Sequence, residues 1–440
     1  MIPNTFELAI IGMGPAGIGV AIAMQSTPVI KNAICFERGA EVGNKNCNII
    51  TNDACCNLDA CHIISGIGGA SNLSSGKLSL FPAGSGLISF FPTEQELKDV
   101  MFEVIHSLEE NAGLKKVEID NETISKTQEH YKANNITYKY YDVYEFDGDK
   151  YLNNLSETIK SLIKSGLQVH TNSEVVAINR DETTLCYTIT ACENGMINRY
   201  SVRNVVFAIG SSEIDQSLGS TFVGETASSY EVGMRVEAKS ECFGKHLSSH
   251  GDLKLKYKSG RTYCVTRGGA IVSYRTDGLF LLEGYINPIQ RTDYSNLAVL
   301  IKVDDNKELT EFLQNYRELF DGVPVRQKYT DYLLGNPSSD SVYTTLSTSK
   351  IGDINKMFSD SINKALREFI NHVINETMHI KQEELTIVAP ELKILRNIEL
   401  NDQFEVAPNL FVVGAATGKF RGILQSVCSG IQCGKYVLRR

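Results

Sequence analysis

Residues 6–17 read Phe-Glu-Leu-Ala-Ile-Ile-Gly-Met-Gly-Pro-Ala-Gly, an apolar run that ends in the glycine pattern G-x-G-x-x-G. A short apolar run that meets glycine directly is typical of a buried parallel strand. Residues 18–25 continue with small apolar side chains at helical spacing, and residues 33–37 form a second apolar run that ends in an acid. The first 40 residues therefore predict a β-α-β unit.

The three glycines of this pattern each have a chemical reason for their position. Gly12 permits the tight turn, Gly14 lets backbone amides approach a pyrophosphate, and Gly17 lets the helix and strand pack closely. The N-terminus of the following helix offers N–H groups and a positive dipole end to phosphates. Glu37 can accept hydrogen bonds from the hydroxyls of an adenosine ribose, and its charge disfavours a 2′-phosphate. The pattern thus predicts FAD or NAD, and not NADP.

Three further features favour FAD over NAD. Glu37 is followed at once by Arg38 and Gly39, as in many flavoproteins. Residues 205–210, Val-Val-Phe-Ala-Ile-Gly, resemble a second flavoprotein signature in mid-chain. Residues 409–414, Asn-Leu-Phe-Val-Val-Gly, precede the last helix, whose N-terminus flavoproteins aim at the flavin. We therefore expect FAD.

The composition is that of an ordinary soluble protein, with 440 residues, a net charge of −9 and 42% hydrophobic residues. The acidic balance argues against nucleic acid and against an anionic membrane surface as partners. No apolar run reaches the ~18 residues that a membrane helix needs. Eleven cysteines without a recognisable export signal predict a cytoplasmic protein.

The rest of the chain predicts a discontinuous domain with insertions. Residues 94–166 have mostly helical patterns, and residues 231–384 contain alternating runs typical of an antiparallel sheet, followed by helices. We predict an α/β fold in three parts, namely a Rossmann-like FAD-binding domain from residues 1–92, 168–230 and 385–440, a helical insertion at 94–166, and a β-rich substrate or cap domain at 231–384.

Four segments resemble one family, the bacterial FAD-dependent dehydrogenases among the glutathione-reductase-like, two-dinucleotide-fold NAD(P)/FAD-dependent oxidoreductases. Residues 65–78, Ser-Gly-Ile-Gly-Gly-Ala-Ser-Asn-Leu-Ser-Ser-Gly-Lys-Leu, are similar to its GGAGAFSDGKL segment. Residues 233–237 resemble its GVRVE motif, residues 263–269 its C-x-x-x-GG segment, and residues 414–423 its C-terminal GDGAG…GG turn. The resemblance covers nearly the whole chain. It implies the fold and FAD, but it does not imply a particular reaction.

Two positions depart from the family pattern. Ala415 and Ser75 stand where the family has acids, and the first of these acids is expected to hold the ribityl chain. FAD is therefore expected to be held more weakly than usual, or with a neighbouring residue in place of the acid.

The expected cofactor contacts come from all of these segments. They are Gly12, Gly14, Pro15, Ala16, Gly17, Glu37, Arg38, Gly69, Ala70, Ser71, Ser74, Lys77, Val175, Ala208, Gly210, Gly414, Ala415, Gly422 and Ile423. A reduced flavin needs a positive group or dipole near its N1–C2 edge, which the helix after Gly422 can supply, with Lys77 as a second candidate.

Three residues are catalytic candidates: Lys77, Arg235 and Cys264. Arg235 lies in an alternating strand, from which it could project into a cleft and bind a substrate carboxylate or phosphate bidentately. The alternative is a structural ion pair with Glu237 or another acid. Arg267 and Arg421 are weaker candidates, for gating the site and for facing the substrate.

A cysteine-rich loop has three competing interpretations. Cys47, Cys55, Cys56, Cys61 and His62 lie within 16 residues. Cys47, Cys55 and Cys61 could hold a metal or an iron–sulfur cluster, with His62 or Cys264 as a fourth ligand. Cys47 and Cys61 could instead form a redox dithiol near the flavin, or all could be buried small residues that pack well.

A separate pair, His246 and His250, has the spacing of one helix face, but surface or loop histidines are the simpler interpretation.

The favoured function is an FAD-dependent oxidoreductase that moves a hydride between flavin N5 and a small-molecule substrate. Transient NAD(P)H or an electron-donor protein could supply electrons. One alternative is a flavin monooxygenase. The alternative of another class is a non-catalytic flavin- or metal-binding redox sensor that uses the Cys47–Cys61 loop.

Overall fold

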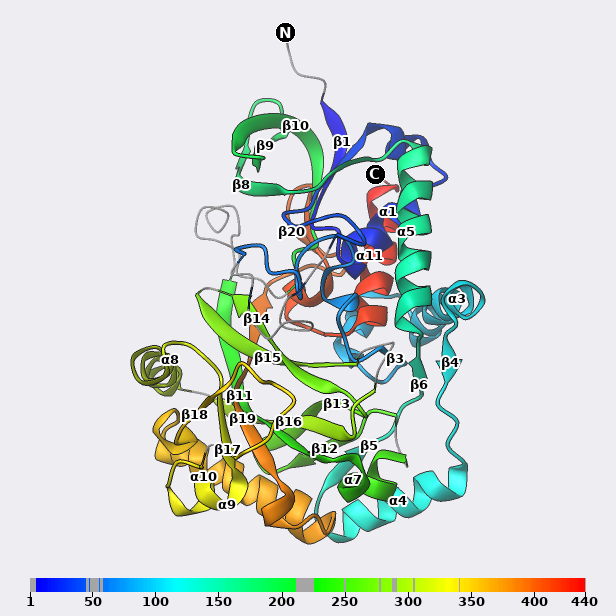
Figure 1. The fold of residues 1–440 in the computed structure, drawn as a ribbon. Helices are drawn as coiled ribbons and strands as arrows, with labels where there is room; N and C mark the ends of the chain where they lie inside the picture. The colour runs from blue at the N-terminus through cyan, green and yellow to red at the C-terminus, as the bar shows by residue number, and fades with distance from the viewer. Residues whose placement is uncertain are drawn as a thin grey trace.

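A computed structural model of the chain describes residues 5–44, 47, 55, 58–210, 225–248, 251–276, 278–286, 291–303, 305–339 and 341–439. In this part of the chain, two eight-stranded sheets lie at opposite ends of the molecule (Figure 1). A smaller three-stranded sheet and a β-hairpin lie between them (Figure 1). The predicted α/β fold class is confirmed.

The first sheet contains the predicted β-α-β unit, with strand order β20-β21-β10-β1-β2-β7. β1 is parallel to β10 and β2, while β9 pairs antiparallel with β10 and with β8. The strands are β1 Phe6–Ile11, β2 Ala33–Phe36, β7 Gln168–His170, β8 Ser173–Arg180, β9 Tyr187–Glu193, β10 Met196–Phe207, β20 Glu405–Ala407 and β21 Leu410–Val412.

Both faces of β1 are covered, which explains its continuous apolar sequence. Leu8 and Ile10 pack with helices α1 (Pro15–Met24) and α11 (Ile423–Val437), whereas Ala9 and Ile11 pack toward β8 and β9. Helices α3 (Glu94–Ala112) and α5 (Gly148–Ser165) lie beyond α11 on the helical side (Figure 1).

The second sheet has the order β18-β17-β19-β11-β16-β13-β12-β5 and is antiparallel except for the β17–β18 pair. Its strands are β5 Thr137–Lys139, β11 Glu225–Lys239, β12 Lys254–Tyr257, β13 Gly260–Thr266, β16 Tyr294–Val303, β17 Val325–Lys328, β18 Lys350–Ile351 and β19 Thr386–Ile398. The run 279–285, predicted to join such a sheet, forms a separate hairpin of β14 (Ala270–Thr276) and β15 (Leu279–Tyr285).

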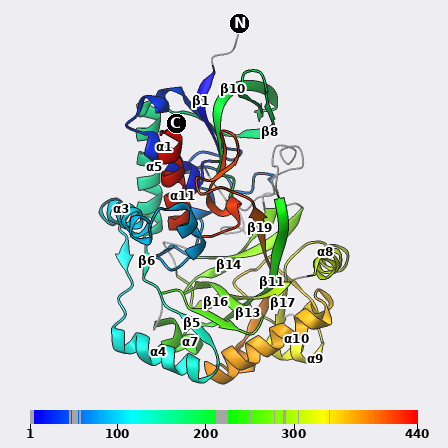
Figure 2. The same cartoon turned by 180° about the vertical axis from the view of Figure 1, so that it is seen from behind.

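Seen from behind, the helices of this half line the outer side of the second sheet (Figure 2). They are α4 Asn121–Ala133, α7 Ser240–Ser248, α8 Asn306–Phe320, α9 Tyr329–Leu334 and α10 Asp360–Phe369, which continues as a π-helix over Ile370–Thr377. A single apolar core joins the inner side chains of β11 and β16 to α8 and α10.

Two segments lie elsewhere than their sequence patterns predict. Residues 94–166 contain strands as well as helices, namely β4 (Lys115–Lys116), β5 and β6 (Val143–Glu145). β5 joins the second sheet, while β4 and β6 pair with β3 (Lys77–Ser79). β19, predicted as part of the FAD-binding domain, is a central strand of the second sheet. Among the described residues, no helix is both long and apolar enough to cross a membrane.

Candidate functional site

The glycine turn after β1 has the close packing that its sequence predicts. Gly12 has φ +94°, and a Cβ there would lie 2.6 Å from the carbonyl oxygen of Ala208. A Cβ on Gly17 would lie 2.0 Å from the carbonyl oxygen of Gly12. These neighbours are backbone atoms that cannot move aside, so both positions require glycine.

Gly14 differs, because a Cβ there would make only an ordinary van der Waals contact. It is the N-cap residue of α1 with ordinary φ −75°, and a Cβ there would meet only the Cα of Gly69, at 3.8 Å. The segment of Gly69 is held over the turn by a hydrogen bond from the N–H of Gly68 to the carbonyl of Met13, 2.8 Å. The two glycine backbones face each other closely, since a Cβ on Gly69 would lie 3.2 Å from the Cα of Gly14, and the narrow space between them is called the Gly14–Gly69 gap below.

Glu37 ties the backbone of this turn to the backbone at Gly39 and at Gly66. The side chain is 5% exposed, and its Oε2 accepts a hydrogen bond from the N–H of Met13 at 2.8 Å. Its Oε1 accepts from the N–H groups of Gly39 at 2.9 Å and Gly66 at 2.8 Å. Since Oε2 has one protein donor, it keeps a lone pair for a further donor such as a ribose hydroxyl.

The N-termini of the two helices that pack on the first sheet, α1 and α11, have no side-chain cap. Helices α3, α4, α5, α8 and α10 each begin with a residue whose side chain accepts a backbone N–H, namely Thr93, Asp120, Asp147, Asp305 and Ser359. In the described chain, α1 and α11 have no such cap and no acid in the first turn. Their N–H groups and positive dipole ends therefore remain available to an anion or a polar ligand.

The same two helices pack against each other through glycines. A Cβ on Gly430 would lie 2.0 Å from the carbonyl oxygen of Ala16, and one on Gly434 would lie 2.6 Å from the Cβ of Ala23. The helices therefore run in the same direction, and α11 begins seven residues before Gly430, at Ile423. At 1.5 Å per residue, its N-terminus lies about 10 Å beyond the start of α1.

The other predicted cofactor residues divide into two groups. Ser71 lies under the gap, where it donates to the carbonyl of Gly68 at 2.6 Å and accepts from the Tyr151 hydroxyl at 2.9 Å. Gly414 packs against Ala16, and its N–H donates to Ser429 Oγ at 3.0 Å. Those near the turn or the start of α11 are Gly12, Gly14, Pro15, Ala16, Gly17, Glu37, Gly69, Ala70, Ser71, Ala208, Gly414, Ala415, Gly422 and Ile423.

The second group contains predicted cofactor residues that lie away from the glycine turn or have partners elsewhere in the protein. Val175, on β8, packs in the apolar core that includes Ile11 of β1, and Arg38 donates through Nε to Ser65 Oγ at 2.9 Å. Ser74 donates to the carbonyl of Ser71 at 3.1 Å, and a Cβ on Gly210 would meet nothing within 4 Å. Lys77 is not directed to the turn, since its ammonium pairs with Asp252 at 2.9 Å and also contacts the carbonyl of Val265.

Arg235 is wholly buried, which contradicts its predicted projection into a cleft. Its Nε donates to Asn296 Oδ1 at 2.8 Å, its Nη2 donates to the carbonyl of Cys264 at 2.6 Å, and its Nη1 lies 3.3 Å from Glu391. The structural ion pair left open by the sequence is thus present, but with Glu391 and not with Glu237. The carboxylate of Glu237 instead accepts from the N–H of Thr345 at 3.0 Å.

A second buried cation completes this cluster. Lys393 lies 2.9 Å from Glu391 and 3.2 Å from Glu283. Burial opposes ionisation of Glu283, but the Lys393 ammonium and the Arg235 guanidinium outweigh it and hold its pKa at about 2. Glu283, Glu391 and Lys393 were missed in the sequence, although two charges in the apolar run of β19 were a visible signal.

Cys264 links this cluster to the segment above the glycine turn. It has φ +43°, which is rare for a residue with a side chain, and lies where the β13–β16 register shifts. Its thiol bonds to Glu283 and lies 4.0 Å from Ser75 Oγ. Burial, and next the Glu283 carboxylate, raise the pKa of Cys264, so the group is a protonated thiol at neutral pH.

The cysteine loop is only partly described, because Cys56 lies outside the described residues. Cys47 and Cys61 are buried thiols in one apolar cluster with Ile63, Val272 and Tyr285. Within the described ranges, no three His, Cys, Asp or Glu side chains are grouped so as to hold a metal. The predicted trio of Cys47, Cys55 and Cys61 is therefore not assembled as a metal site, and the packing interpretation fits Cys47 and Cys61.

The remaining predicted side chains have structural partners. His246 Nδ1 lies 3.0 Å from the Tyr131 hydroxyl, and His250 lies outside the described residues, so their pairing stays a prediction. Arg267 donates to the carbonyl of Leu247 at 3.1 Å and pairs with Glu145. Arg421 donates to the carbonyl of Ile394.

No protein-family model and no curated protein matches the chain. Among solved structures, it is similar to a glycerol-3-phosphate dehydrogenase from Bacillus halodurans complexed with FAD, with 10% identity, 99% of this chain and 65% of that chain covered, and a TM-score of 0.42. It is also similar to a glycine oxidase from Geobacillus kaustophilus, with 14% identity, 99% and 95% covered, and a TM-score of 0.42. The chain thus spans about two thirds of the length of the dehydrogenase. Likenesses this distant carry no functional argument.

Proposed function

We propose that the chain is an FAD-dependent oxidoreductase that transfers a hydride between the flavin and a small-molecule substrate. The observation that supports it most is the pair of uncapped, parallel helix N-termini, one behind the Gly14–Gly69 gap and one at Gly422. Their separation of about 10 Å suits a phosphate-linked ribityl chain between a pyrophosphate and a flavin ring.

The residues present fit the parts of FAD in order. Glu37 has an acceptor left for the adenosine ribose, and the N–H groups of the first turn of α1 face the place of the pyrophosphate. The gap is bordered by the backbones of Gly14 and Gly69 and by the Pro15 ring, and a large side chain at Gly14 would block it. The N-terminus of α11 supplies the positive dipole end that favours negative charge on a reduced flavin.

When bound, the flavin supplies the hydride acceptor or donor. The chain contributes a proton-carrying group at Cys264, whose thiol is held by Glu283 beside Ser75. Arg235 and Lys393 are positioning residues, since they keep Glu283 ionised as an acceptor for that thiol. Lys77 is also a positioning residue, because its bonds to Asp252 and Val265 fix the 74–78 segment against the second sheet.

The test is the visible spectrum of the purified full chain, with the cofactor identified after acid release. We expect a two-band flavin spectrum and released FAD. Gly14→Trp, whose Cβ would lie 3.8 Å from the Cα of Gly69, is expected to give folded protein without FAD. Lys364→Trp, on the exposed side of α10, is the matched control and is expected to retain FAD.

Two outcomes would contradict the proposal. One is a colourless wild-type protein that does not bind added FAD. The other is full FAD occupancy in Gly14→Trp, because the indole would then share the gap with the pyrophosphate. The chain has no natural tryptophan, so the fluorescence of each variant reports only the introduced residue.

A further inference from the structure

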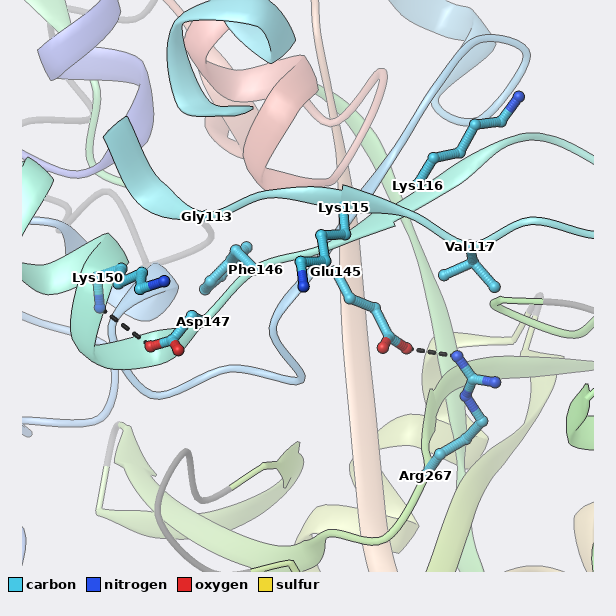
Figure 3. A pocket seen from close by; sticks show the side chains of 9 residues that line it. All are labelled: Gly113, Lys115, Lys116, Val117, Glu145, Phe146, Asp147, Lys150 and Arg267. Carbon is cyan, nitrogen blue, oxygen red and sulfur yellow. Dashed lines mark hydrogen bonds and ion pairs between the residues drawn. The ribbon is translucent and has the colours of Figure 1, made fainter. Parts of the chain in front are cut away.

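A cavity of about 360 Å³ opens at the three-stranded sheet, away from the Gly14–Gly69 gap (Figure 3). It lies between β4, β6, the N-terminus of α5 and the turn after β13. It is lined by Gly113, Lys115, Lys116, Val117, Glu145, Phe146, Asp147, Lys150 and Arg267. Its volume is within the range of small-molecule sites, about 300–1,000 Å³.

The cations of this cavity are not all neutralised by the protein. Arg267 pairs with Glu145, and Lys116 pairs with Asp142 at 3.1 Å and points away from the other side chains (Figure 3). Asp147 caps α5, where its Oδ1 accepts the N–H groups of residues 149 and 150. Among the described residues, the ammonium groups of Lys115 and Lys150 form no ion pair, and they lie on either side of Phe146 (Figure 3).

Lys150 is exposed, and its stem passes close to the backbone of Gly113. Its side chain lies across Gly113, the αL residue that ends α3, where a Cβ would be 2.9 Å from Lys150 Cδ and 3.5 Å from Nζ. A side chain at Gly113 would therefore displace the ammonium. Lys115 and Lys150 both line the cavity, so an anion placed between them would be attracted by two positive charges.

We propose that this cavity binds a small molecule that carries a phosphoryl group on an apolar or aromatic body. Lys115 and Lys150 would flank the phosphoryl oxygens as point charges, whereas Arg267 at the rim is already paired with Glu145. Phe146 and Val117 provide the apolar wall for the body of the ligand. The cavity carries more cations than anions, although the chain as a whole has a net charge of −9.

The wall of the cavity is bonded to the segment above the glycine turn. Glu145 is paired in register with Lys77, and the N–H of Phe146 donates to the carbonyl of Gly76 at 3.0 Å. The Phe146 ring stacks on Tyr151 with centroids 4.4 Å apart, and Tyr151 donates to Ser71. The cavity wall thus contacts residues 71–77, but the proposed site itself does not depend on the proposed cofactor.

The test uses phenyl phosphate as the probe, titrated into the full chain by calorimetry at low ionic strength. We expect binding, weaker binding of inorganic phosphate, and none of benzyl alcohol. Lys115→Gln and Lys150→Gln are each expected to weaken phenyl phosphate binding roughly tenfold, since each loses one charge-assisted contact. Both side chains are exposed, so the variants are expected to fold, with far-ultraviolet circular dichroism as the check.

Lys160→Gln is the matched control, because it removes an exposed lysine of the same helix that pairs with Glu157 at 2.7 Å. It is expected to bind phenyl phosphate as the wild type does. Gly14→Trp separates this cavity from the glycine turn and is also expected to bind normally. The proposal is overturned if the wild type does not bind phenyl phosphate, or if Lys115→Gln and Lys150→Gln bind as well as Lys160→Gln.

Discussion

Replacing Glu37 by glutamine tests whether one carboxylate organises the glycine turn. The carboxylate accepts three backbone N–H groups, from Met13 on one oxygen and from Gly39 and Gly66 on the other. Met13 and Gly66 lie 24 and 29 residues from Glu37 along the chain, so the side chain bridges these two segments and its own. Glutamine has the same shape but only one acceptor oxygen, and its amide nitrogen must face a backbone N–H.

The expected loss follows from the number of bonds removed. Whichever way the amide turns, either the Met13 bond or the two glycine bonds disappear, and the donors stay buried. A hydrogen bond to a charged group contributes about 1.5–3 kcal/mol. We therefore expect Glu37→Gln to lower the free energy of unfolding by about 2–5 kcal/mol. Typical domain stabilities of about 5–15 kcal/mol leave the variant folded.

The assay is urea unfolding followed by circular dichroism, together with the FAD retained after desalting. Glu311→Gln, on an exposed position of α8, is the control and is expected to match the wild type in both. Glu37→Gln should unfold at a lower urea concentration and retain less FAD. Equal urea midpoints for the two variants would refute the bridging role. Lower stability with unchanged FAD retention would refute the contact with the ribose.

Three other predictions use the same unfolding assay. Gly17→Ala, whose Cβ would lie 2.0 Å from a backbone oxygen, should lower the free energy of unfolding by about 3 kcal/mol. Gly14→Ala should stay within about 1 kcal/mol of the wild type. Equal losses in the two variants would contradict the packing argument. Arg235→Met should lower the free energy of unfolding by about 3–5 kcal/mol because it leaves buried carboxylates without a cation. Adding Glu391→Leu should restore part of that free energy. A double variant no more stable than Arg235→Met would contradict this explanation. Burial lowers the pKa of His246 to about 4, below the unfolded value of about 6.5, so the unfolded chain binds the proton first as pH falls. The neutral, buried His246 therefore makes the free energy of unfolding about 3 kcal/mol larger above pH 6.5 than near pH 4. His246→Gln should lose correspondingly less free energy of unfolding than the wild type between pH 7 and pH 4.5.

Individual strands and helices were predictable wherever the apolar residues repeat with a single strand-like or helix-like spacing. The β-α-β unit follows from an apolar run, a glycine turn and a helical repeat, all within 40 residues. The partners of a strand depend on residues far along the chain, which no local pattern contains. The sequence of β19 is typical of a β-strand, but only the structure shows that this strand lies between β17 and β11.

The site shows the same division between local and distant information. Glu37 was predicted to bind a ribose because it ends the second strand, and the structure puts it at the turn. Its bond to Gly66 joins residues 29 positions apart and could not be inferred from spacing. The uncapped start of α1 was implicit in Gly14-Pro15, since neither residue carries a capping side chain.

The error at Arg235 has an instructive physical cause. The prediction assumed that alternation along β11 leaves one face open, as in a sheet covered on one side. β11 is instead a central strand between β16 and β19, and residues 231–238 are buried on both faces. A charge there must be paired, and Glu391 and Glu283 supply the pairing. The cation then affects chemistry through its neighbours. It keeps Glu283 ionised and holds the carbonyl of Cys264, so that a buried cation acts on the residues beside it.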